Sequence, residues 1–350
     1  MFYWLTKKRI SLYIALSTAF LLTMYNYYSK VDDDNPYLNG EQYFNSENTK
    51  NIDRLCSTLF TNVCYSVVDR ISEDGFVDRF IILNDDFRFL ETSVKLIKPD
   101  GHDFWTSDTT LWKINHNHID GDYIIMLATI PFAMNIMSQS PNTKGNILEI
   151  GLGGGSLSMF LHTKYRNFNI TVSEIEEQMI IIARKYFDIQ YNSHNYHIKY
   201  EDGIKTIEDS VLSNTLYDVI ILDACEASEP IPCPVEAFTK DDILDKIKQI
   251  LKPTGIFSVN LLITNENSSY HFKNFLEKLF KRFPVCMYGH SDDELNTVIG
   301  CVKYSINNLE ESQSIFQNTY EKLIDEWQLP EYMKDIKFKL LNKSGLKTIY

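Results

Sequence analysis

Apolar residues in the second half of the chain follow two alternating patterns. The runs "NILEIGL", "NITVSEI", "YHIKYEDG", "YDVIILDA" and "GIFSVNLLI" are typical of strands. Between them, segments such as "EEQMIIIARKYF" place Met179, Ile182 and Tyr186 on one helical face. Strands that alternate with helices predict a parallel, doubly wound sheet. We therefore expect an α/β fold, with this domain over residues 123–305.

The region before this domain has a different pattern. Runs of strand type, "CYSVVDRI", "FVDRFIIL", "RFLETSVKLI" and "TLWKINHNHI", are separated by turn compositions such as "SEDG" and "PDGHD". They predict a small antiparallel β domain over residues 53–122, followed by the apolar helix "DYIIMLATIPFAMNIM". Later, "DDILDKIKQILKP" predicts a helix that Pro253 ends, and residues 306–350 are expected to form an amphipathic helix and a tail.

The N-terminal segment differs from both domains. Residues 10–28 carry no charge, and their length approaches the ~20 residues that cross a hydrocarbon core. Because "KKR" precedes this run, the positive-inside rule places the N-terminus in the cytoplasm. We expect a cytoplasmic tail and transmembrane anchor over residues 1–30, a stalk over 31–52, and a location in the endoplasmic reticulum or Golgi membrane. A cleaved signal peptide is the main alternative, although no small-x-small site follows the run.

Charge and cysteine content narrow the partners and the compartment. The net charge is −13, and the chain has no basic cluster larger than "KKR". We therefore expect no nucleic-acid partner. A homodimer is one assembly that we consider. The six cysteines are compatible with an oxidising compartment. Cys286 and Cys301 fall opposite each other in a predicted hairpin, as a disulfide or as two buried thiols, and Cys56 with Cys64 is the other candidate pair.

A glycine-rich run, "LEIGLGGGS", follows the first parallel strand and opens a helix. This is where ligands bind on doubly wound sheets, and glycine lets a ligand lie against the backbone. A dinucleotide site prefers a third glycine where this chain has Ser156. The spacing of Gly151, Gly153 and Gly155, with Glu149 two residues earlier, is instead that of S-adenosylmethionine sites. NAD is the weaker alternative, since it would need a second nucleotide half-site.

Three further acids follow or end the next strands. Glu174 is placed to accept the two ribose hydroxyls of an adenosyl cofactor. Asp202, followed by Gly203, is placed for the adenine amino group, and Asp223 lies beside the expected sulfonium. One acid at a strand end is most often a polar cap. Four acids at successive strand ends indicate a cationic cofactor, S-adenosylmethionine.

The runs "GLGGGSL", "DVIILDA", "CPVEAF" and "ILKPTGIFSVNL" carry a family resemblance. They resemble the spermidine synthase-like branch of class I methyltransferases, and within it the C-terminal domain of the eukaryotic elongation factor 1A lysine and N-terminal methyltransferase. The resemblance covers roughly residues 63–302. It implies a Rossmann-like domain preceded by a small β domain, with S-adenosylmethionine as cofactor.

The chain also departs from the polyamine synthases of that branch. The acid of their glycine loop is Gly154 here, and their Tyr-His-Glu signature is reduced to Tyr123 followed by two isoleucines. Their pair of gate acids is kept as Asp223 and Glu226. Aminopropyl transfer to a polyamine therefore stays an alternative.

The reaction that we expect is methyl transfer to an amine, either a protein N-terminus or a lysine. Asp223 would orient the amine and take its proton, and Glu226 would frame the acceptor pocket. A membrane-anchored binding protein without catalysis is a third hypothesis, because S-adenosylmethionine is made in the cytosol. We expect no metal site at His116 and His118, which would share one face of a strand without further ligands. Cys225 is expected to be a small apolar filler.

Overall fold

The computed structural model describes four stretches of the chain: residues 48–189, 194–226, 232–262 and 266–343. The expected anchor and most of the expected stalk lie outside these residues. Within the described stretches, no helix has the length and apolar character needed to cross a membrane.

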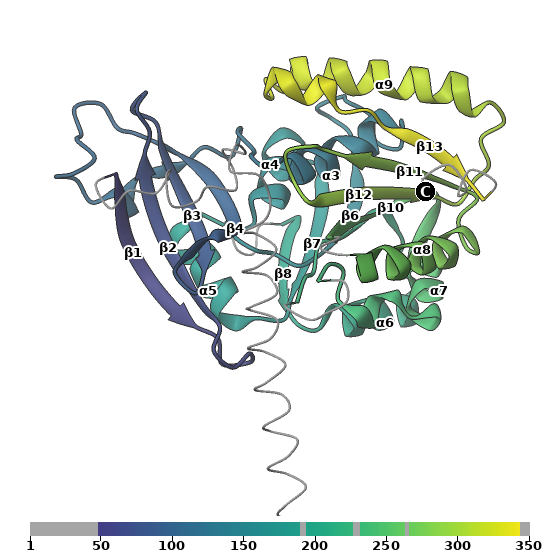
Figure 1. Cartoon of the computed structure of the whole chain (residues 1–350), viewed down its shortest axis with the longest axis horizontal. Helices are drawn as coiled ribbons and strands as arrows, with labels where there is room; N and C mark the ends of the chain where they lie inside the picture. The colour runs from purple at the N-terminus through teal and green to yellow at the C-terminus, as the bar shows by residue number, and fades with distance from the viewer. Residues whose placement is uncertain (1–47, 190–193, 227–231, 263–265, 344–350) are drawn as a thin grey trace, which may run out of the picture. The chain divides into compact units, whose positions relative to one another are not determined.

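The first five strands form the predicted small antiparallel sheet, in sequential order (Figure 1). They are β1 (Thr49–Cys56), β2 (Cys64–Ile71), β3 (Val77–Leu83), β4 (Asp86–Ile97) and β5 (Lys113–Ile114). The sheet begins at Thr49, so part of the segment expected to be stalk is a strand. The polar sequence of β1 did not predict a strand, because β1 lies at the sheet edge and none of its residues is fully buried.

The predicted strand around the two histidines is wrong. Only a 3-10 turn (Thr109–Leu111) and the two residues of β5 are regular there. His116 and His118 follow in a turn, so they do not share a strand face. His118 lies 2.9 Å from the Asp120 carboxylate, and no group of metal-ligating side chains occurs among the described residues.

The second sheet has eight strands in the order β13-β11-β12-β10-β9-β6-β7-β8. Strands β10, β9, β6, β7 and β8 are parallel, as predicted, and the other three are antiparallel. The eight are β6 (Gly145–Ile150), β7 (Phe168–Glu174), β8 (Tyr196–Tyr200), β9 (Tyr217–Leu222), β10 (Leu251–Leu262), β11 (Val285–His290), β12 (Asn296–Val302) and β13 (Lys339–Asn342). The chain runs from β6 to β7 on one side and returns to β9 on the other. The ends of β6 and β9 therefore form the switch point.

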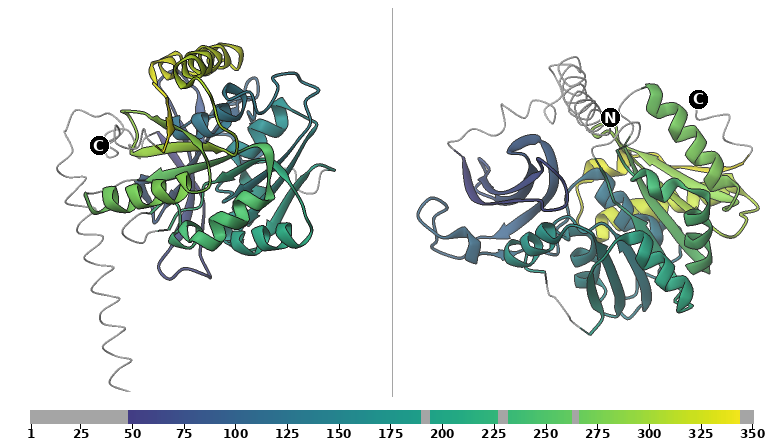
Figure 2. Two further views of the ribbon diagram at one scale, coloured as in Figure 1. Left: turned by 90° about the vertical axis from the view of Figure 1, so that its right-hand side faces the viewer. Right: turned by 90° about the horizontal axis from the view of Figure 1, so that it is seen from below.

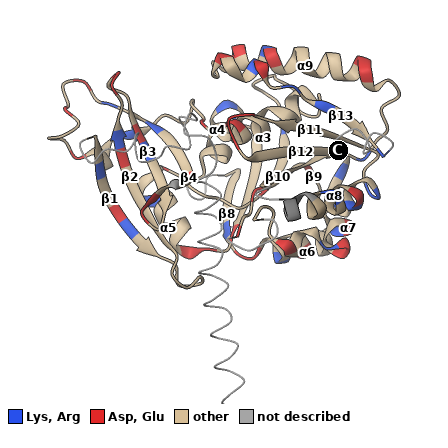
Figure 3. Ribbon diagram, in the orientation of Figure 1, with Lys and Arg blue, Asp and Glu red and all other residues tan. Residues whose placement is uncertain are grey.

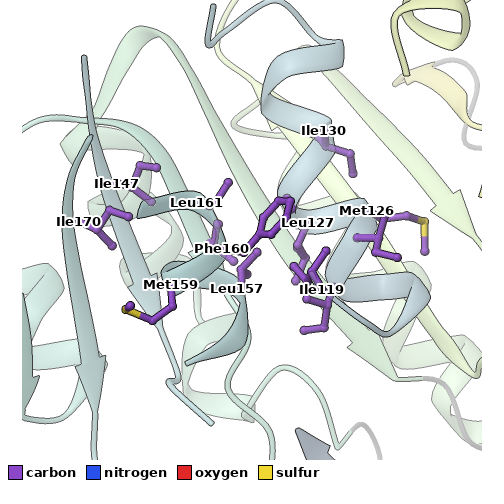
Figure 4. Packing of buried hydrophobic residues seen from close by; sticks show 14 of the residues in the cluster. Ile119, Met126, Leu127, Ile130, Ile147, Leu157, Met159, Phe160, Leu161 and Ile170 are labelled. Atoms are coloured by element: carbon purple, nitrogen blue, oxygen red, sulfur yellow. The ribbon is translucent and has the colours of Figure 1, made fainter. Parts of the chain in front are cut away.

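Helices cover both faces of this sheet (Figure 2). They are α3 (Asp122–Ala133), α4 (Ser156–Lys164), α5 (Glu177–Tyr186), α6 (Gly203–Leu212), α7 (Asp241–Ile250), α8 (Glu266–Phe280) and α9 (Leu309–Glu326). Apolar residues of α3, α4, α5 and α9 share one core with the small sheet, and those of α6, α7 and α8 form the other. Figure 4 shows Phe160 and Leu157 of α4 between Ile147 on β6 and Leu127 on α3.

Two boundaries in the second sheet differ from the prediction. Helix α7 ends at Ile250, and β10 begins at once, so Pro253 lies in the strand. The irregular pairing with β9 between Leu251 and Ile256 accommodates this proline. The C-terminal segment also contributes the four-residue strand β13, which pairs with β11. A run this short carries no readable periodicity.

All six cysteines form disulfides. The two candidate pairs, Cys56–Cys64 and Cys286–Cys301, are both confirmed. The third disulfide joins Cys225 to Cys233. The prediction of Cys225 as an apolar filler is therefore wrong. Cys233 forms an isolated bridge with Leu262 at the end of β10, a tertiary contact that sequence spacing does not reveal.

A buried ion pair links the small sheet to the second domain. Arg79 on β3 donates to both carboxylate oxygens of Asp69 on β2, at 2.7 and 2.8 Å. The same guanidinium donates to the carbonyls of Thr109 and of Tyr186 at the end of α5. Arg79 thus satisfies a buried carboxylate and ties the two domains together.

Candidate functional site

Three amides of the glycine loop are hydrogen-bonded to other segments of the protein. Gly151 N donates to the Ser173 carbonyl at 2.9 Å, and Leu152 N donates to Glu174 Oε2 at 2.9 Å. Gly154 N donates to Thr92 Oγ1 on β4 of the small sheet, at 2.8 Å. An anion cradle needs free amides, and these three are already used.

Each loop glycine also makes room for a protein neighbour. Gly151 has φ +96°, and a Cβ there would lie 2.1 Å from the Asp223 carbonyl oxygen. A Cβ on Gly153 would meet Thr92 Oγ1 at 2.9 Å, and one on Gly155 would meet Ile189 at 2.1 Å. The glycines therefore let β9, the small sheet and the segment after α5 close onto the loop.

Glu149 and Glu174 come together at the end of the parallel strands. Glu149 is 3% exposed, and burial raises its pKa well above the usual value, while Ser158 on α4 hydrogen-bonds to it. Its Oε2 has no hydrogen-bond partner among the described residues. Glu174 accepts from the amides of Leu152 and Glu176, and burial raises its pKa as well. The charge of Glu174 acts on Glu149, so the two carboxylates share one region.

Asp223 follows β9, beside the loop. Asn260 on β10 donates to Asp223 Oδ1 at 2.9 Å, and Asn296 on β12 donates to Asn260 Oδ1 at 2.9 Å. Burial raises the pKa of Asp223 to about 6, and the Asn260 bond opposes that rise. Glu226 lies in the segment that the Cys225–Cys233 disulfide closes, where its amide donates to the Pro232 carbonyl.

Asp202 and Gly203 lie at the start of α6. Asp202 Oδ1 accepts from Ile204 N at 2.8 Å, which makes it an N-cap. A Cβ on Gly203 would meet Ile150 at 2.4 Å, so core packing requires this glycine. The adenine contact expected of these residues stays a prediction.

Two residues near the site, Glu91 and Tyr123, were not among the predicted site residues. Glu91 on β4 has a solvent-accessible side chain. Its pKa is raised to about 7 because surrounding protein displaces water and because Asp223 and Glu174 lie nearby. Tyr123 on α3 has its pKa raised by burial, then by Asp223, Glu294 and Glu91. Only tertiary contacts bring Glu91 to the strand ends, and its sequence neighbourhood gives no signal.

The carboxylates suit a cationic ligand better than a pyrophosphate. Within the described part of the chain, no Lys or Arg contributes to the pKa of the four acids nearest the loop, Glu91, Glu149, Glu174 and Asp223. Basic residues are dispersed over both sheets instead (Figure 3). A buried acid without a cation is costly, and a positive ligand relieves that cost. The site thus fits the ammonium and sulfonium of S-adenosylmethionine.

Comparison with known proteins agrees with this geometry. Residues 131–291 match the family model described as "Spermine/spermidine synthase domain". An "eEF1A lysine and N-terminal methyltransferase homolog" of Drosophila melanogaster is 29% identical over 181 residues, 51% of this chain and 26% of that protein. A polyamine aminopropyltransferase of Vibrio vulnificus is 34% identical over 129 residues, 35% of this chain and 42% of that protein.

The solved structure of a probable spermidine synthase from Corynebacterium glutamicum has a TM-score of 0.60. The match covers 86% of this chain and 92% of that chain, at 15% identity, and shows the fold alone. The chain spans about a quarter of the length of the methyltransferase that it matches.

Proposed function

We propose that this chain, whose residues 131–291 match the family model described as "Spermine/spermidine synthase domain", is an S-adenosylmethionine-dependent methyltransferase acting on a protein amine. The observation that carries the proposal is the set of carboxylates at the glycine loop, which no described cation neutralises. The similarity to a protein named as a lysine and N-terminal methyltransferase supports an amine as the acceptor.

Three carboxylates would hold the cofactor and prepare the acceptor. Glu149 would hold the cationic end, and Glu174 would accept the ribose hydroxyls with lone pairs that remain beside its hydrogen bonds from the amides of Leu152 and Glu176. When bound, S-adenosylmethionine would supply the methyl group to the acceptor nitrogen and would leave as the neutral thioether, with the electrons of the C–S bond on sulfur. Asp223 takes the proton of the acceptor nitrogen, because a carboxylate with a pKa of about 6 is ionised at neutral pH yet more basic than an ordinary aspartate. Glu226 frames the acceptor side.

The three disulfides support work in an oxidising compartment. This agrees with the uncharged run over residues 10–28, which we propose as the membrane anchor that places the body of the protein across the membrane. The cofactor must then reach that compartment. Protease protection of the full chain in sealed microsomes tests the topology: digestion of the body without detergent would reject it.

Aminopropyl transfer is the second candidate. The matches to the family model and to the bacterial aminopropyltransferase favour it. Asp223 and Glu226 also stand where the polyamine synthases have their pair of gate acids. Against it, Gly154 stands where the polyamine synthases have an acid. A binding protein without catalysis is the third.

Calorimetry of the full-length chain with S-adenosylmethionine and S-adenosylhomocysteine tests the proposal. If neither ligand binds, the proposed methyltransferase function is refuted. Turnover of diamines with decarboxylated S-adenosylmethionine, without turnover of peptides, would select aminopropyl transfer. Asp223→Ala should abolish methyl transfer and leave cofactor affinity nearly intact, because Asp223 acts on the acceptor. An equal loss of both would assign Asp223 to cofactor binding instead.

A further inference from the structure

Glu91 reaches the site from the small sheet, and the backbone fixes its place. Oγ1 of its neighbour Thr92 accepts a hydrogen bond from Gly154 N at 2.8 Å. The Glu91 carbonyl oxygen lies 3.7 Å from where a Cβ on Gly153 would be, and the Asp223 carbonyl oxygen lies 2.1 Å from the corresponding point on Gly151. Glu91 therefore borders the loop at Gly153 and Asp223 borders it at Gly151, and the two acids come from different sheets.

The Glu91 carboxylate has no hydrogen bond or ion pair with any described residue. After the displacement of water, the charge of Asp223 is the largest influence that raises its pKa, followed by that of Glu174. Burial raises the pKa of Tyr123 on α3, and the charges of Asp223 and Glu91 add to that rise. Two facing carboxylates repel each other until a cation binds between them.

A second acid near Asp223 also has no cation acting on it among the described residues. Glu149 is 3% exposed, its Oε2 has no partner among the described residues, and the charges acting on it are those of Asp223 and Glu174. Asp223 thus influences both Glu149 and Glu91, whereas Glu149 is not among the influences on Glu91. Glu149 lies on β6, whereas Glu91 lies on β4 of the small sheet and borders Gly153, so the two acids approach the loop from different elements. The cofactor cation belongs to the Glu149 side, which leaves the Glu91 side for a different positive group.

We infer that Glu91 and Asp223 bind the alkylammonium group of the acceptor, so that the small sheet supplies half of the acceptor site. The inference rests on the proposed methyltransferase function. Glu91 holds the amine as a cation beside the loop. One proton then passes from the ammonium nitrogen to the Asp223 carboxylate and leaves the nitrogen lone pair free for attack, while Glu91 stays ionised and balances the charge. Neutral acceptors, such as hydroxyl groups, would gain nothing from Glu91.

Binding to the full-length chain saturated with S-adenosylhomocysteine tests this assignment without turnover. The probe is Nα-acetyl-lysine amide, and its uncharged counterpart is Nα-acetyl-norleucine amide. Glu91→Gln should weaken the lysine probe about tenfold, the loss expected for a hydrogen bond to a charged group. It should leave the norleucine probe and S-adenosylhomocysteine unchanged within about twofold. Glu73→Gln, an exposed acid in the turn between β2 and β3, is the matched control and should change neither affinity.

The possible results separate the two hypotheses. Equal affinity of wild type and Glu91→Gln for the lysine probe, or no wild-type binding of that probe, overturns the assignment. An equal loss of S-adenosylhomocysteine binding in Glu91→Gln also overturns it, because Glu91 would then serve the cofactor. A wild type that binds no S-adenosylhomocysteine refutes the proposed function instead. Glu91→Asp, which keeps the charge, should bind the lysine probe more tightly than Glu91→Gln, and a thermal melt confirms that each variant is folded.

Discussion

The side chain of Asn260 controls the protonation of Asp223. Its Nδ2 donates to Asp223 Oδ1 at 2.9 Å, while its Oδ1 accepts from Asn296 Nδ2 at 2.9 Å. The bond from Asn296 occupies the amide oxygen and so turns the amide nitrogen towards Asp223. Asn260→Leu keeps the approximate size of the side chain and removes the donor, which leaves the Asp223 carboxylate without its one hydrogen bond from a side chain among the described residues.

The size of the effect follows from the energy of this bond. A hydrogen bond to a charged group is worth about 1.5–3 kcal/mol, and about 1.4 kcal/mol corresponds to one pH unit. Asn260→Leu should therefore raise the pKa of Asp223 by about one to two pH units above its present value of about 6. Only ionised Asp223 can take a proton, so kcat/KM at pH 7 should fall about two- to tenfold and recover near pH 9.

The assay is the pH dependence of kcat/KM for wild type, Asn260→Leu and Asn296→Leu. The acid limb of Asn260→Leu should lie at higher pH than that of the wild type. Asn296→Leu should move it less and in the same direction, because the donor on Asn260 remains. If Asn260→Leu lowers kcat/KM by one factor at every pH, with the acid limb in place, Asn260 only supports the fold and the reasoning is wrong.

Three further changes test the domain contact, the loop and the cofactor site. Arg79→Met leaves the buried Asp69 carboxylate unpaired and should lower the free energy of unfolding in urea by about 3–5 kcal/mol; a loss below about 1 kcal/mol would contradict the role of this pair. Gly151→Ala should lower both the melting temperature and kcat, since its Cβ would strike the Asp223 carbonyl, whereas Gly75→Ala, with φ +79° and nothing within 4 Å, should cost only about 1–2 kcal/mol of backbone strain. Glu149→Gln should weaken S-adenosylmethionine about tenfold in calorimetry. Burial raises the pKa of Glu149, and a bound cation would lower it, so wild-type binding should release protons and tighten as pH rises; affinity that stays constant between pH 6 and 9 would argue against this role.

The predicted strands were right where burial on both faces makes the sequence almost wholly apolar. The runs that end near Ile150 and Leu222 belong to such strands, and alternate residues on each face enter different cores. The pattern of apolar residues did not predict the edge strands or the start of β10. Strand β1 is a polar edge strand, β13 has four residues, and Pro253 lies in a strand because the irregular start of β10 needs no regular pairing there.

The site residues also fall into those that the sequence predicts and those that it does not. Glu149, Glu174 and Asp223 could be predicted, because strand ends in a parallel sheet must meet at one edge. Glu91 and Asn260 could not, because nothing in their own sequence neighbourhoods says which loop they approach. Glu91 depends on the docking of a second sheet, and Asn260 depends on the neighbouring positions of β9 and β10.

The glycine loop shows that a correct location can rest on an incomplete reason. The sequence suggested bare backbone for a ligand, yet Gly151 and Gly155 make room for protein atoms, and the amides of Gly151, Leu152 and Gly154 already have partners. A pyrophosphate would have to compete for these donors, whereas a cation needs only the carboxylates that the loop brings together. The same closeness that consumes the amides delivers Glu174 and, through Thr92, the small sheet. Three of the loop's donors thus serve the fold, and the same contacts bring Glu174 and the small sheet to the site, so cofactor binding and domain docking depend on one segment.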